Sequence, residues 1–159
     1  MTHLFIDAEY AFTCAMREGM IPNYRAITDL FKKRHAALTM YAYFVGDKKK
    51  KKAISEFLHY IGIPYITIMD IEHISKAQVI GSQIAIDTVR FITSGVDAEY
   101  AFLSGDDYLI PLIEYISKYN MKPTVYYFPI IVSKELEKSL HCKLHKLTDG
   151  FFTFPKDKL

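Results

Sequence analysis

Two apolar segments that each end on an aspartate constrain the fold of this chain most strongly. In "HLFIDAEY" the apolar run ends at Asp7, and in "AFLSGDDYLIPL" a second run turns through "SG" into the adjacent carboxylates Asp106 and Asp107. Short apolar runs of this kind are typical of strands buried in a parallel sheet. Open α/β sheets carry their sites at the carboxyl ends of their strands, so we predict that these two strand ends meet.

Strand and helix patterns alternate along the whole chain. Strands are expected at 3–6, 38–45, 63–69, 100–103 and 123–128, with a last edge strand at 151–154. Helices are expected between them, at 24–34 after the possible N-cap Asn23, through 54–61, and at 78–93, 109–116 and 133–140. This alternation predicts an α/β fold with a mostly parallel sheet of five or six strands and helices on both faces.

The bulk properties of the chain restrict its class. Its 159 residues suffice for one core and no linker divides them, so we expect a single domain over 1–159. A net charge of +2 is too small to indicate nucleic-acid binding by itself. We expect no leader peptide and no membrane span. Two cysteines without metal-type spacing favour a reducing, cytoplasmic setting.

Carboxylates that share one sheet edge repel each other. If the first and fourth strands are neighbours, Asp7 and Asp106 line one crevice and need a cation between them. Mg²⁺ or Mn²⁺ suits such a site, because hard divalent ions prefer oxygen ligands. Asp87 lies on the apolar stripe of its helix, where it needs an ion or an ion pair, for example with Arg90. A solvated loop acid at Asp7 and a helix N-cap at Asp106 or Asp107 remain alternatives.

Basic, hydroxyl and aromatic side chains are expected near the same edge. Lys48, Lys49 and Lys50 begin a run of five lysines after the second strand, and they either hold phosphates or form a solvated helix start. Ser104 is a candidate for a phosphate contact, and Tyr10 is a candidate for stacking on a base. Ordinary core or surface packing is the alternative for such a tyrosine.

Five segments of the chain carry a family resemblance. "LFIDAEY", "IAIDTVRF", "FLSGDDYLIPLI", "PTVYYF" and "SKELEKSLHCKLHKL" resemble, in this order, the NYN domains of the LabA-like group within the PIN-like nucleases. The resemblance implies a Rossmann-like three-layer sandwich with strand order 3-2-1-4-5 and an acidic pocket that binds Mg²⁺ or Mn²⁺. It also implies hydrolysis of phosphodiester bonds, usually in RNA. Asp7, Asp87 and Asp106 match the family's acids.

Three positions depart from the family pattern. Tyr10 stands where the family commonly has Asn, Gly81 where it has Asp before the helix acid, and Tyr108 where it has a second Asp after "SGD". Asp107 lies one position before the site of that second acid. These departures put catalytic competence in question and leave the predicted fold unchanged.

Two functional hypotheses follow from these residues. In the first, the protein is a metal-dependent nuclease that acts on RNA rather than DNA, with Asp7, Asp87 and Asp106 as ligands of one or two metal ions. Asp107 then either orients the attacking water or completes the second ion site. In the second, the pocket is degenerate, and the protein binds nucleic acid, a nucleotide or a partner protein without cleavage. A homodimer stays open as its assembly. A phosphatase of the haloacid-dehalogenase type is disfavoured, because Glu9 stands where such enzymes need a second Asp.

Overall fold

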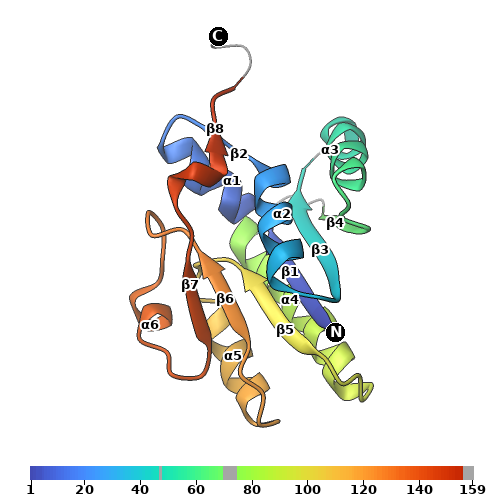
Figure 1. The fold of residues 1–159 in the computed structure, drawn as a ribbon, viewed down its shortest axis with the longest axis vertical. Coiled ribbons are helices and arrows are strands. Elements are labelled where there is room, and N and C mark those ends of the chain that lie inside the picture. The colour runs from blue at the N-terminus through green and yellow to red at the C-terminus, as the bar shows by residue number, and fades with distance from the viewer. Residues whose placement is uncertain (47, 70–74, 156–159) are drawn as a thin grey trace.

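A six-stranded parallel sheet with the order β4-β3-β1-β5-β6-β7 forms the centre of the protein (Figure 1). The structure is a computed structural model that describes residues 1–46, 48–69 and 75–155. The strands are β1 (Thr2–Asp7), β3 (Leu38–Val45), β4 (Tyr65–Met69), β5 (Glu99–Leu103), β6 (Thr124–Tyr127) and β7 (Lys143–Lys146). The predicted α/β class and the order 3-2-1-4-5 are confirmed, and β7 adds a sixth strand beside β6.

Helices cover both faces of the sheet. The helices are α1 (Ala8–Arg17), α2 (Tyr24–Arg34), α3 (Lys48–Tyr60), α4 (Lys76–Thr93), α5 (Leu109–Ser117) and the short α6 (Lys134–Glu137). Alternate residues of β1 pack against the helices on opposite faces of the sheet, because successive side chains of a strand point to opposite faces. Leu4 and Ile6 pack with α1, α2 and α3 in one core, whereas Phe5 packs with α4 and α5 in the other.

The predicted starts of α2 and α6 agree with the structure, because a capping side chain marks each of them. Asn23 caps α2, and its side-chain oxygen accepts a hydrogen bond from the backbone N–H of Ala26 at 3.1 Å. Pro111 lies in the first turn of α5, where the missing N–H has no intrahelical partner to lose. Ser133 caps α6 and accepts from the N–H of Leu136 at 3.3 Å.

Three elements differ from the prediction. The helix α1 starts directly after β1, where no helix was predicted, and apart from Tyr10 the side chains that it buries are small, such as Ala11 and Ala15. The strand β7 is short and polar in sequence. The expected edge strand at 151–154 is instead β8 (Phe152–Thr153), which pairs antiparallel with β2 (Ile21–Pro22) in a separate two-stranded sheet. A 3₁₀ turn, η1 (Asp149–Phe151), precedes it.

The helices in the described part of the chain were compared with the requirements for crossing a membrane. None of the helices there combines the length and the apolar composition needed to cross a bilayer.

Candidate functional site

The structure brings Asp7 and Asp106 together at the carboxyl edge of the sheet. β1 lies between β3 and β5, at the point where the chain reverses its direction across the sheet. Asp7 is the last residue of β1, and Asp106 follows the end of β5 by three residues. Both line a cavity of about 220 Å³, which we call the edge crevice, together with Glu9, Tyr10, Thr13, Lys76, Ala77 and Ile131.

Asp7 is buried, and each of its carboxylate oxygens accepts a hydrogen bond. The N–H of Tyr10 donates to Oδ1 at 2.9 Å, so Asp7 caps α1, and the hydroxyl of Tyr108 donates to Oδ2 at 2.8 Å. Burial raises the pKa of Asp7 to about 7 against the effect of both hydrogen bonds, and the charge of Asp106 also raises it. A large fraction of the Asp7 carboxyls is therefore protonated at neutral pH.

The loop after β5 arranges the other acids differently. Asp106 is half-buried, and burial, followed by the charge of Asp107, raises its pKa above the ordinary value. Asp107 is exposed and does not line the edge crevice. The hydroxyl oxygen of buried Ser104 accepts from the N–H of Asp106 at 3.2 Å, so this side chain shapes the loop. The predicted phosphate contact of Ser104 remains a prediction.

Tyr10 is fixed by the backbone that follows β6. Its hydroxyl donates to the carbonyl oxygen of Ile131 at 2.6 Å and accepts from the N–H of Phe128 at 2.9 Å. A Cβ on Gly105 would overlap this hydroxyl, so the "SGD" turn approaches the Tyr10 ring as closely as a glycine allows. The ring is 4% exposed, which leaves little of it free to stack on a base.

Tyr108 occupies the space between α4 and Asp7. A Cβ on Gly81 would lie 2.5 Å from Cγ of the Tyr108 ring, so the ring packs directly on the bare backbone of α4. The departures from the family pattern at positions 81 and 108 are therefore physically coupled, because a side chain at 81 and the Tyr108 ring cannot occupy the same space.

Asp87 does not join Asp7 and Asp106. Its Oδ2 accepts from the hydroxyl of Tyr43 at 2.8 Å, and its Oδ1 accepts from the side-chain amide of Gln83 at 3.1 Å. It lines a different cavity from the one lined by the other two acids. Six residues turn an α-helix by about 600°, so Asp87 points about 120° away from the face of α4 on which Gly81 meets the Tyr108 ring. Asp87 therefore lies apart from Asp7 and Asp106 in this structure, and its role as a metal ligand stays a prediction.

The donors of the edge crevice do not fit a metal centre of three carboxylates. Among residues 1–46, 48–69 and 75–155, no three His, Cys, Asp or Glu side chains are placed to hold a metal ion together. Both oxygens of Asp7 face hydrogen-bond donors. Glu9 accepts from the N–H of Val45 at 3.2 Å and pairs with Lys76 at 3.3 Å. A third carboxylate does not join Asp7 and Asp106 here, and the Mg²⁺ or Mn²⁺ site implied by the resemblance stays a prediction.

Glu9 and Lys76 line the edge crevice, although neither was predicted from the sequence as a site residue. The position of Glu9 in the first turn after Asp7 is the signal that could have identified it. Lys48, Lys49 and Lys50 begin α3, which follows the carboxyl end of β3. Their side chains lie outside the described part of the structure, so their phosphate contacts stay a prediction.

Comparison with known proteins identifies the family. The fold is similar to the crystal structure of a protein of unknown function, VPA0982, from Vibrio parahaemolyticus RIMD 2210633, with a TM-score of 0.76 and 18% sequence identity. That similarity covers 96% of this chain and 95% of the other and concerns the fold alone. No curated protein matches the chain. The family model "NYN domain" matches residues 1–152. The chain therefore belongs to the NYN domain family, within the PIN-like nuclease superfamily, which supports a function related to nucleic acids.

Proposed function

We propose that this NYN domain binds nucleic acid, RNA in preference to DNA, at the carboxyl edge of its sheet without cleaving it. The proposal rests on the position of Tyr108. Its hydroxyl donates a hydrogen bond to Asp7, and its ring packs on Gly81. The resemblance implies acids at positions 81 and 108. Here the Tyr108 ring fills that space beside Gly81, and Asp7 and Asp106 lack the further carboxylates that the family resemblance implies.

The electrostatics of the edge crevice support binding of a polyanion. Two ionised carboxylates would repel a phosphate backbone, but the raised pKa of Asp7, about 7, reduces the negative charge of the edge crevice near neutral pH. Lys76 is exposed at the rim of the edge crevice. The five lysines that begin at Lys48 add positive charge after β3, a position suited to phosphate contacts.

Binding and cleavage can be separated in one experiment. Labelled single-stranded RNA, hairpin RNA and DNA are titrated with the protein in EDTA, in Mg²⁺ and in Mn²⁺, and the strands are then inspected on a denaturing gel. We expect RNA to bind in EDTA and to stay intact in both metals. The triple change Lys48→Gln, Lys49→Gln and Lys50→Gln should weaken binding and reduce its salt dependence, since each lost phosphate contact lowers the salt slope by roughly one.

A variant with a reconstructed acidic pocket tests whether Gly81 and Tyr108 prevent metal binding. Gly81→Asp combined with Tyr108→Asp removes the ring that fills the space and adds the two acids that the family resemblance implies. We expect this double variant to bind Mn²⁺ in isothermal titration, whereas the wild type does not. Mn²⁺ binding by the wild type with equal affinity would contradict the proposal.

A metal-dependent nuclease is the second candidate function. The observation that favours it is the placement of Asp7 and Asp106 in one cavity at the strand ends. Metal-dependent RNA cleavage by the wild type, abolished by both Asp7→Asn and Asp106→Asn, would establish this candidate and overturn the binding proposal. Cleavage that survives both changes would come from a contaminating nuclease and would disappear on further purification.

Three further statements about the protein are proposals. We propose that residues 1–159 fold as one domain and that the protein works in a reducing cytoplasm. The second proposal is supported by Cys14 and Cys142, which are both buried, free thiols. A homodimer stays a prediction that sedimentation can test.

A further inference from the structure

Four aromatic rings stack in register across the sheet and end at its edge. Phe102 on β5, Phe5 on β1, Tyr41 on β3 and Tyr65 on β4 pair in successive ladders. Their centroids are 5.5, 5.1 and 5.0 Å apart, with interplanar angles of 21°, 15° and 15°. Tyr65 is 55% exposed, because β4 is the outermost strand. The row of rings therefore ends on an aromatic surface that is open to solvent.

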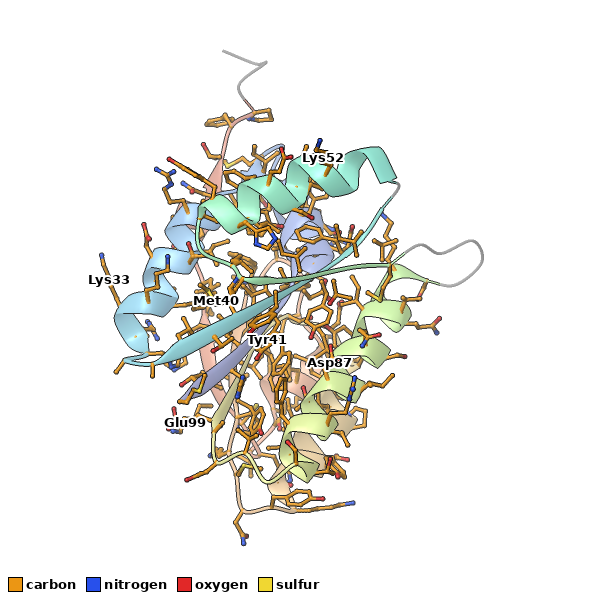
Figure 2. The ribbon with its side chains drawn as sticks, turned by 90° about the vertical axis from the view of Figure 1, so that its right-hand side faces the viewer. Lys33, Met40, Tyr41, Lys52, Asp87 and Glu99 are labelled. Atoms are coloured by element: carbon orange, nitrogen blue, oxygen red, sulfur yellow. The ribbon has the colours of Figure 1, made fainter. Side chains whose placement is uncertain are left out.

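A cavity lies between this end of the row and α4, and we call it the aromatic cavity. Its volume of about 570 Å³ falls within the range of sites that bind small organic molecules. Figure 2 faces this side of the molecule and shows Asp87 on α4 and Tyr41 on β3. The lining residues are Tyr41, Tyr65, Thr67, Asp87, Arg90, Phe91 and Ser94.

The polar groups of the aromatic cavity are held in place before any ligand binds. Asp87 is fixed by the hydroxyl of the buried Tyr43 on one oxygen and by Gln83 on the other. Each carboxylate oxygen accepts about two hydrogen bonds, so both oxygens retain capacity for another donor. The hydroxyl of Tyr41 lies 3.0 Å from Nδ1 of His3, which stacks on Phe91 with the ring centroids 4.5 Å apart. These contacts set the orientations of the Asp87 and Tyr41 side chains independently of any ligand.

We propose that the aromatic cavity binds a guanine base. A planar base can stack on the exposed tyrosine ring, and a carboxylate beside it selects an edge with two neighbouring N–H donors. Guanine presents such an edge at N1 and N2, whereas adenine, cytosine and uracil each offer one donor group on the same edge. The exposed guanidinium of Arg90 is placed to meet the O6 atom or a phosphate. This site is separate from the edge crevice and does not depend on the function proposed for it.

Nucleotide titrations test the base preference. Calorimetric titration with GMP, AMP, CMP and UMP should show GMP binding about tenfold or more tightly than the other three, as expected for a bidentate contact to one base. Amide chemical shifts should move at Thr67 and Ser94, which line the aromatic cavity, and not at Asp106 in the edge crevice. Equal affinity for all four nucleotides, or shifts confined to the edge crevice, would overturn the proposal.

Matched variants separate the contact from general effects on the fold. Asp87→Asn replaces one acceptor oxygen by a donor and should remove the preference for GMP while the thermal unfolding profile stays cooperative. Asp29→Asn makes the same change at an exposed acid on α2 and should leave the preference intact. Tyr65→Ala should weaken GMP binding, and Tyr65→Phe should preserve it because the ring remains. An Asp87→Asn protein that still prefers GMP would refute the assignment.

Two short RNAs distinguish the sources of the base. The pentamers UUGUU and UUAUU are compared with free GMP and AMP. Tighter binding of UUGUU than of GMP assigns the cavity to an unpaired guanine in a strand. Binding of GMP without binding of UUGUU assigns it to a free guanine nucleotide. Failure of both ligands overturns the proposal and leaves the result at the edge crevice unaffected.

Discussion

Replacement of Asp7 by asparagine tests the electrostatic description of the edge crevice most directly. The variant keeps the acceptor for the N–H of Tyr10 and removes the charge. Its new amide can donate to the hydroxyl of Tyr108, which turns from donor to acceptor. Asp7→Asn therefore imitates the protonated carboxyl that burial favours, and it should fold with the same contacts.

The magnitude follows from the pKa of Asp7, which rises from 3.8 to about 7 on folding. At about 1.4 kcal/mol per pKa unit, ionisation of this group costs the folded state on the order of 4 kcal/mol at pH 8. The folded protein holds the proton more tightly than the unfolded chain does. The protonated Asp7 carboxyl therefore makes its full contribution to folding stability below about pH 4, and this contribution is lost as the pH rises through 7. Roughly 2.5 kcal/mol of this loss falls between pH 5 and pH 8.

Urea denaturation at pH 5 and at pH 8, followed by circular dichroism, measures this difference. The free energy of unfolding of Asp7→Asn, relative to wild type, should increase by roughly 2.5 kcal/mol from pH 5 to pH 8. Asp29→Asn serves as the control, since Asp29 is exposed, and should show a much smaller change. An Asp7→Asn protein that loses stability equally at both pH values would refute the reasoning, because it would show that the ionised carboxylate is well stabilised in the fold.

Three further substitutions test the packing around the edge crevice and the cap of α2. Gly81→Ala should destabilise the protein by about 1–3 kcal/mol, because the new Cβ overlaps the ring of Tyr108, and Tyr108→Ala should relieve that penalty in a double-mutant cycle followed by thermal denaturation. Tyr10→Phe should cost about 1–3 kcal/mol in urea denaturation, since it leaves the buried N–H of Phe128 without its acceptor. Asn23→Ala should cost about 1 kcal/mol through the lost cap of α2, also measured by urea denaturation.

The sequence predicts the position of the edge crevice because its main determinants are local. An apolar run that ends on an acid fixes both a strand and the location of its carboxylate, and a parallel sheet then brings such ends to one edge. Asp7 and Asp106 lie in one cavity for this reason. The caps Asn23 and Ser133 were equally visible, since a cap depends on a side chain and the N–H groups two or three residues away.

Other features were not visible because they depend on long-range packing. The four-residue strand β7 carries polar residues, and only its pairing with β6 makes it a strand. The helix α1 buries mostly small side chains beside Tyr10, so it lacks the large aliphatic residues by which the other helices were recognised. Asp87 lies on the buried side of α4, as its spacing indicates, but the partner that it meets is Tyr43, 44 residues earlier in the chain. No local pattern distinguishes such a hydroxyl partner from a metal ion.

Only the fold shows that the departures from the family pattern at positions 81 and 108 depend on each other. Along the chain, Gly81 and Tyr108 are two independent losses of an acid. In the fold, the absence of a side chain at 81 makes room for the ring at 108, and the hydroxyl of that ring replaces a cation as the partner of Asp7. An acid restored at 81 alone would collide with the ring, and an acid restored at 108 alone would place another carboxylate near Asp7. Recovery of a metal site therefore requires both changes at once, which is why the double variant is the decisive reconstruction.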